Sequence, residues 1–170
     1  PDLKKVVDGM PNLEKHIENA RKFGLNPVVS INHFYTDSEE EIQEVIQACA
    51  KMGVKAVLAK GWADGGAGTI ELAKAVVAEI EGGQSQFKPL YDWNSPVKEK
   101  IETIAKEVYG ADGVDYDKKA LTDLANINKL GLSALPICMA KTQKSFSDNE
   151  ALLGRPTGFR VTVREFEIAA

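Results

Sequence analysis

The sequence has few of the residues and patterns that mark several large classes of protein. Its 170 residues include only two cysteines, Cys49 and Cys138, and these lack a C-x-x-C spacing. We therefore expect neither a disulfide framework nor a cysteine-based metal site, and a reducing compartment fits best. No apolar run approaches the ~20 residues that a membrane-spanning helix needs, and no signal peptide opens the chain. These absences predict a cytoplasmic protein.

Signatures of nucleic-acid, metal and nucleotide binding are missing too. The net charge of −4 provides no electrostatic reason to bind nucleic acid or an anionic membrane surface. No grouping of metal-ligating side chains is visible. The glycines Gly65, Gly66 and Gly68 match neither G-x-G-x-x-G nor a P-loop, because no Lys-Ser or Lys-Thr follows them. This pattern argues against a Rossmann-type oxidoreductase.

What the sequence does contain is an alternation of helical and strand patterns. Three stretches with helical spacing of apolar residues alternate with two short apolar runs, in the order 3–20, 27–32, 38–52, 54–59 and 70–82. This order predicts a βαβα unit with a parallel sheet. Within it, we expect Pro11 to break or restart the first helix and Ser38 with Glu41 to form a capping box.

The second half of the chain predicts further α/β structure. Residues 84–94 are polar and aromatic without a clear period, which is typical of a connection. Beyond them, Ser95-Pro96 predicts a capped helix start, a weaker helix is expected around 121–130, and apolar runs at 135–140 and 159–168 predict strands. We expect an α/β fold of parallel-sheet βαβ units flanked by helices, with lobes at 1–83 and 95–170 joined by 84–94.

Two aromatic residues follow the first two predicted strands. Ligands of open parallel sheets bind beyond the carboxyl ends of strands, and Asn32, Phe34 and Trp62 are expected there. The two rings can face each other across a slot and clamp a flat heterocycle, with each stacked ring contributing ~0.5–1.5 kcal/mol beyond area burial. The alternative is that both rings cap the end of the sheet as core. The residues alone leave both interpretations open.

The glycine cluster lies at the same predicted edge. Gly65, Gly66 and Gly68 lead directly into the helix expected at 70–82, and free backbone N–H groups there would suit a carboxylate or phosphate. The alternative is a flexible loop that needs positive φ angles.

Polar side chains after the predicted strand at 135–140 form a second group of candidates. Lys141, Thr142 and Gln143 carry donors that can hold a ligand or a neighbouring domain. Arg155 has a planar guanidinium suited to a carboxylate or phosphate, and the alternative is an ion pair that tethers its loop. Cys138, inside the apolar run, is expected to be a buried and inert thiol.

Several motifs in one consistent order carry a resemblance to a known family. They lie at 12–19, 31–34, 62–68, 109–114, 139–143, 153–156 and 161–165, and they include Ile-Asn-His-Phe, Trp-Ala-Asp-Gly-Gly-Ala-Gly, Met-Ala-Lys-Thr-Gln and Leu-Gly-Arg-Pro. In these motifs the chain resembles the formate–tetrahydrofolate ligases, also called 10-formyltetrahydrofolate synthetases. The resemblance extends nearly from end to end.

The resemblance implies an activity and a set of binding residues. Such enzymes use ATP and formate to make formyl phosphate, which N10 of tetrahydrofolate then attacks. The resemblance places the pterin ring between Phe34 and Trp62. Further substrate or interdomain contacts are expected at Asn32, Gly65, Gly66, Lys141, Thr142, Gln143 and Arg155. It also implies Mg²⁺ with the ATP, a monovalent cation, and a homo-oligomer.

The chain also departs from the family pattern. Tyr35 stands where a proline is common, which affects the edge of the slot. The phosphate-binding loop of the family is missing from the sequence, and we expect a segment of a longer polypeptide that holds no catalytic residue and is inactive alone. The alternative function is a non-catalytic binding or oligomerisation module on the same scaffold.

Overall fold

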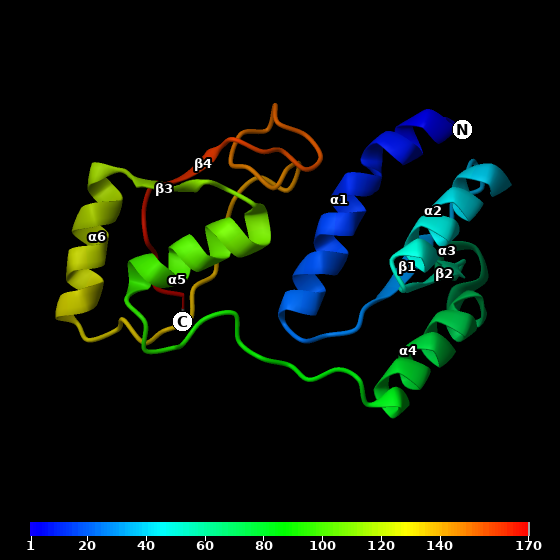
Figure 1. Ribbon diagram of the computed structural model, residues 1–170, viewed down its shortest axis with the longest axis horizontal. Coiled ribbons are helices and arrows are strands. Elements are labelled where there is room, and N and C mark those ends of the chain that lie inside the picture. Colours follow the sequence, from blue (N-terminus) through cyan, green and yellow to red (C-terminus); the bar gives the residue numbers. More distant parts are fainter. Residues whose placement is uncertain (170) are drawn as a thin grey trace. The chain divides into compact units, whose positions relative to one another are not determined.

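The computed structural model describes residues 1–169, and the chain divides into two compact units, Pro1–Lys88 and Pro89–Ala170. Each unit combines helices with one two-stranded parallel sheet, β1 with β2 and β3 with β4 (Figure 1). The predicted α/β class is therefore confirmed. The lobe limits at 83 and 95 remain predictions.

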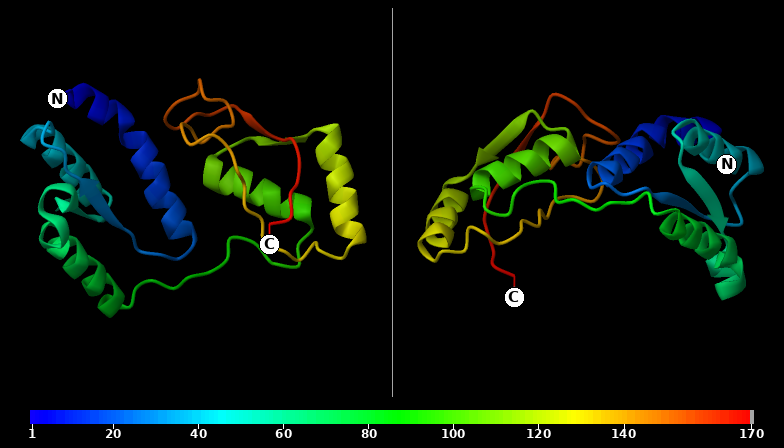
Figure 2. Two further views of the ribbon diagram at one scale, coloured as in Figure 1. Left: turned by 180° about the vertical axis from the view of Figure 1, so that it is seen from behind. Right: turned by 60° about the horizontal axis from the view of Figure 1, so that its bottom comes forward.

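The first unit is a βαβ unit preceded by one helix and followed by another. Its elements are α1 (Leu3–Lys22), β1 (Val28–Asn32), α2 (Glu39–Lys51), β2 (Lys55–Ala59), the short α3 (Gly61–Asp64), the 3-10 helix η1 (Gly65–Thr69) and α4 (Ile70–Gly82). Helices α2 and α4 both contact β2, and α1 packs against α2 (Figure 2). Ile17, Cys49 and Val54 form the buried centre of this unit.

Pro11 lies inside α1, so the predicted break at this residue is wrong. An interior proline removes one backbone hydrogen bond and costs ~3 kcal/mol or more in a helix. Burial on the carboxyl-terminal side of Pro11 offsets that cost, because Ile17 packs with Cys49 and Val54. At the start of α1, the Asp2 side chain accepts a hydrogen bond from the Lys5 N–H. Tertiary packing therefore outweighs the local preference.

Helix α2 begins with the predicted capping box. The Ser38 hydroxyl accepts a hydrogen bond from the Glu41 N–H at 3.3 Å, and the Glu41 carboxylate accepts one from the Ser38 N–H at 2.9 Å. Hydrogen bonds from the backbone of Ser38 and Asp2 lower the pKa of Glu41. The cap fixes where the chain turns from the end of β1 into α2.

The second unit packs helices and a parallel pair around its own core. Its elements are α5 (Val97–Ile104), the π-helical turn η2 (Ala105–Tyr109), β3 (Gly113–Tyr116), α6 (Lys118–Lys129) and β4 (Arg160–Val163). The buried core of this unit consists of Val97, Ile101, Ala105, Ala111, Val114, Leu124, Phe159 and Val161. The predicted helix start is shifted by one residue, since Pro96 is the N-cap of α5 and no side chain caps it.

The apolar run at 135–140 is not a strand, which corrects the prediction. The parallel partner of β4 is β3, with Val114 opposite Val161. The run at 135–140 has no neighbouring strand in its unit, although Ile137 and Met139 still pack against the core. Cys138 lies between these two residues and is exposed, so the expectation of a buried thiol is also wrong.

Candidate ligand site at the carboxyl ends of β1 and β2

The candidate site begins where two paired strands end together. Asn32 is the last residue of β1 and lies opposite Ala59, the last residue of β2. The pairing continues one step further, because the His33 N–H donates to the Ala59 carbonyl at 3.0 Å. The chain therefore leaves both strands at the same edge of the sheet, and the residues that follow β1 and β2 are neighbours there.

A closed turn presents Phe34 and Tyr35 at this edge. The Phe34 N–H donates to the Asp37 carboxylate at 2.8 Å, and the Asp37 N–H donates to the Phe34 carbonyl at 3.0 Å. These two hydrogen bonds tie the ends of the turn to each other. The Phe34 side chain is 50% exposed and that of Tyr35 is 86% exposed. The turn is thus held by one backbone hydrogen bond and by the Asp37 carboxylate, while its rings are exposed.

The segment after β2 is helical rather than a flexible loop, and it carries Trp62. Helix α3 is followed directly by η1 and α4. The Lys60 N–H donates to the Gly68 carbonyl at 2.9 Å. A Cβ at Gly68 would lie 2.5 Å from the Lys60 carbonyl oxygen, so only glycine allows this close approach. The Trp62 side chain, held in this closed segment, is 76% exposed.

The glycines of this segment have separate roles. Gly65 adopts a positive φ of 58° between α3 and η1, as the flexible-loop interpretation expected for at least one of them. The Gly66 carbonyl accepts a hydrogen bond from the Thr69 hydroxyl at 2.9 Å. No side chain caps the start of α4. The segment is therefore closed by the backbone hydrogen bond between Lys60 and Gly68 and by the Thr69 hydroxyl.

The exposure of the two rings bears on the two interpretations of the aromatic pair. A ring that capped the sheet as core would be largely covered, yet Trp62 and half of Phe34 remain accessible. Among residues 1–169 the two rings do not stack on each other. Flat surfaces left open at the carboxyl end of a parallel pair are what a stacking ligand needs.

The second group of candidates lies in the other unit, where Lys141 is engaged by its own loop. Its ammonium donates to the carbonyls of Thr142, at 2.8 Å, and Ser145. It also lies 5.2 Å from the centre of the Tyr109 ring. Burial lowers the pKa of Lys141, while the charge of Asp148 acts in the opposite direction. Lys141 therefore ties the loop together, and the side chain of Gln143 beside it is exposed.

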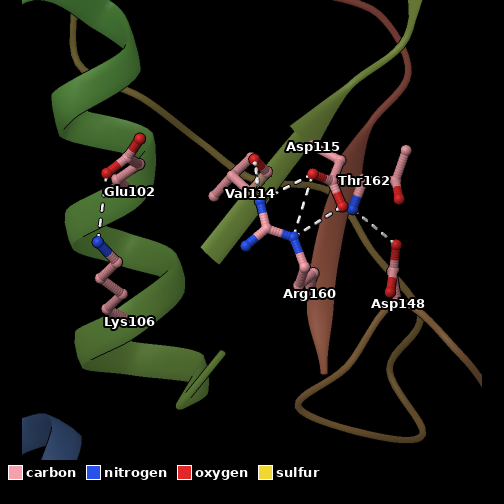
Figure 3. Close-up of polar contacts among 7 residues, drawn as sticks. All are labelled: Glu102, Lys106, Val114, Asp115, Asp148, Arg160 and Thr162. Atoms are coloured by element: carbon pink, nitrogen blue, oxygen red, sulfur yellow. Dashed lines mark hydrogen bonds and ion pairs between the residues drawn. The ribbon is translucent and has the colours of Figure 1, made fainter. Parts of the chain in front are cut away.

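The loop that follows Lys141 is anchored to β4. Ser145 and Ser147 are buried and their hydroxyl oxygens lie 3.1 Å apart. The Asp148 carboxylate accepts a hydrogen bond from the Thr162 N–H at 2.9 Å (Figure 3). Arg155 is exposed on the same loop. The loop is therefore an ordered part of the second unit.

Sequence reasoning missed one polar pair across β3 and β4. The Arg160 guanidinium donates to both oxygens of Asp115, at 2.8 and 2.9 Å, and to the Val114 carbonyl at 3.0 Å (Figure 3). Hydrogen bonds from Arg160 lower the pKa of Asp115. A Cβ at Gly113 would overlap the guanidinium, so this glycine leaves room for it. Because the strand β3 was not predicted from the sequence, Asp115 could not be placed beside Arg160.

The described residues contain no ready metal site and no membrane helix. Within residues 1–169 no group of three or more His, Cys, Asp and Glu side chains is placed to hold a metal ion. In the same part of the chain, no helix is long and apolar enough to cross a membrane.

Fold and site together define an α/β protein with an exposed aromatic pair at the carboxyl ends of parallel strands. The family model described as formate–tetrahydrofolate ligase matches residues 1–170. The chain therefore belongs to the formate–tetrahydrofolate ligase family, as the sequence motifs indicated. This is a family of ATP-dependent ligases that use formate and tetrahydrofolate as substrates.

Proposed function

We propose that this chain provides the folate-binding part of a ligase that joins formate to N10 of tetrahydrofolate through formyl phosphate. The observation that carries the proposal is the pair of exposed rings, Phe34 and Trp62, on closed segments that leave adjacent parallel strands. The pterin is a flat heterocycle, and it stacks between the two rings. Asn32 ends β1 at the same edge, within the region that the polar rim of the pterin reaches.

The chemistry of the proposed reaction sets what these residues do. Formyl phosphate is already activated, so the protein mainly positions the amine of the folate and excludes water. Rings held by closed turns suit this task because little side-chain and loop freedom is lost on binding. ATP with Mg²⁺ and a monovalent cation, homo-oligomeric assembly and a cytoplasmic location belong to the same proposal for the enzyme.

Removing the Trp62 ring tests the proposed pterin site. We expect Trp62→Ala to weaken tetrahydrofolate binding by about 10-fold or more, because it removes both a stacked ring and its buried area. Isothermal titration calorimetry measures this loss without needing Trp62 as a reporter. Trp93→Ala is the matched control, since Trp93 is an exposed tryptophan of the other unit, and it should bind as the parent chain does. Equal affinities for all three chains would refute the stacking role of Trp62.

The ATP-dependent step is expected to need residues beyond these. The sequence contains no phosphate-binding loop, so we expect the pure 170-residue chain to produce no formate-dependent ADP. A coupled assay for ADP, with and without formate and tetrahydrofolate, measures this. Turnover that depends on formate would show that the expectation is wrong, while leaving the folate site to be judged by calorimetry.

The alternative function, a module for binding or assembly, has one observation in its favour. Val76, Val77 and Ile80 on α4 are exposed apolar side chains. A chain that forms stable oligomers but does not bind tetrahydrofolate would favour this alternative. Sedimentation velocity beside the calorimetric titration separates the two functions.

A further inference from the structure

Lys100 on α5 is a fully buried lysine without an acidic partner. Its side chain is 0% exposed, and among residues 1–169 no carboxylate lies within salt-bridge distance of its ammonium. Removing a charged group from water is expensive unless hydrogen bonds compensate for the lost hydration. An apolar side chain of similar length would fill the same space without that cost. The ammonium must therefore do something that packing alone does not.

The partners of Lys100 are backbone carbonyls of one distant segment. Its ammonium donates to the Ser133 carbonyl at 2.7 Å and to the Leu135 carbonyl at 3.2 Å. It also lies 5.9 Å from the centre of the Tyr91 ring. Hydrogen bonds from a charged donor are stronger than those between neutral groups. The lysine thus binds the chain between α6 and the Lys141 loop.

Tyr91 continues the same pattern one step further along the segment. Its hydroxyl accepts a hydrogen bond from the Ile137 N–H at 3.0 Å. Ser133 and Leu135 lie in a turn that the hydrogen bond from the Leu135 N–H to the Leu132 carbonyl closes at 3.1 Å, and residues 136–140 follow it without regular secondary structure. Lys100 and Tyr91 therefore bind the backbone of this turn and of Ile137 just after it, through three hydrogen bonds. This explains how the apolar run is held although it belongs to no sheet.

The segment leads directly to the Lys141 loop. Ile137 and Met139 pack on the core of the second unit, and the Lys141 ammonium then binds the carbonyls of Thr142 and Ser145. The position of the loop depends on where residues 133–137 are held. We infer that Lys100 is a positioning residue, which together with Tyr91 fixes residues 133–137 and thereby sets the position of Lys141, Thr142 and Gln143.

Hydrogen exchange read by mass spectrometry tests this role directly. In Lys100→Met, which keeps the apolar stem, we expect amides of residues 133–141 to exchange about 10-fold faster or more, because two hydrogen bonds from a charged donor are lost. Amides of β3 and β4 should exchange at the parental rate. Lys98→Met is the matched control, since Lys98 lies on the same helix and is exposed. Exchange of 133–141 that stays at the parental rate overturns the inference.

A second variant distinguishes a local effect on residues 133–141 from a general loss of stability. Tyr91→Phe keeps the ring that faces Lys100 and removes only the acceptor of the Ile137 N–H. It should speed exchange at Ile137 and increase acylation of Lys141 by an amine-reactive reagent. The Lys100→Met chain should show the same rise in Lys141 acylation. Faster exchange spread evenly over the whole unit in both variants would show a merely structural role and overturn the inference.

The inference deepens the proposed function. The positioning role of Lys100 stands by itself, and only its importance for ligand binding rests on the proposed function. Titration of the parent chain with tetrahydrofolate tests the proposed function by itself. If the parent chain does not bind tetrahydrofolate and residues 133–141 exchange faster in both variants, the proposed function is refuted and the positioning role of Lys100 is supported. If the parent chain binds tetrahydrofolate and the exchange rates of residues 133–141 are unchanged in both variants, the proposed function is supported and the positioning role is refuted.

Discussion

Replacing Ile101 by alanine should lower the free energy of unfolding of the second unit by about 2–5 kcal/mol. Ile101 is 1% exposed and lies in the core between α5, β3 and β4, where it joins Val114 and Val161. The substitution removes three buried carbon atoms and leaves a cavity that the helix and strands cannot fully close. Urea denaturation followed by circular dichroism measures the loss.

The same substitution at an exposed site provides the control. Ile168 belongs to the same unit and is 55% exposed, so Ile168→Ala should change the free energy of unfolding by no more than ~0.5 kcal/mol. If the two variants lost equal stability, the cluster around Ile101 would not be the core of this unit.

Replacing Gly24 by alanine should destabilise the first unit through two separate effects. Gly24 has a φ of +72°, which alanine adopts only with strain of roughly 1–2 kcal/mol. In addition, a Cβ there would overlap the carbonyl oxygen of Gln86. The Gln86 N–H donates to the Gly24 carbonyl at 2.8 Å, and the Lys88 N–H donates to the Phe23 carbonyl at 3.0 Å. We expect the new methyl group to release residues 85–88, and limited proteolysis with thermal denaturation measures both effects.

Gly83 isolates the backbone effect from the steric one. Its φ is +63°, but a Cβ there would meet no atom within 4 Å. Gly83→Ala should therefore show only the loss due to strain, and residues 85–88 should keep the protection of the parent chain. The steric account of Gly24 fails if Gly83→Ala opens residues 85–88 to protease as much as Gly24→Ala does.

The first unit was largely predictable because its signals are local. The apolar runs that became β1 and β2 are separated by a helix whose capping box, Ser38 with Glu41, is written in four consecutive residues. A parallel pair follows from that order, because parallel strands need a crossover. The position of Phe34 and Trp62 after the two strands was predictable for the same reason. Their exposure was not, because it depends on how the segments after the strands fold.

The second unit was less predictable because its signals depend on distant partners. The run at 135–140 has the composition of a strand, but a strand requires a neighbouring strand, and here Lys100 and Tyr91 bind the backbone of the run instead. The real strand β3 is only four residues long, which is too short to show a period of two. Lys141 was expected to hold a ligand or a neighbouring domain. In the structure its ammonium donates to carbonyls of its own loop, and no local pattern reveals that.

The two parallel pairs also differ in how much chain must fold back before they form. β1 and β2 are joined through residues 33–54, whereas β3 and β4 are joined through residues 117–159, a connection about twice as long. Each doubling of a loop adds ~0.6 kcal/mol to the entropy cost of closure, and folding slows as contacts become more distant in sequence. During synthesis, the whole crossover between β1 and β2 leaves the ribosome well before β4 is made. The sheet of β1 and β2 therefore forms first, and the sheet of β3 and β4 cannot form until residues 160–163 have been made.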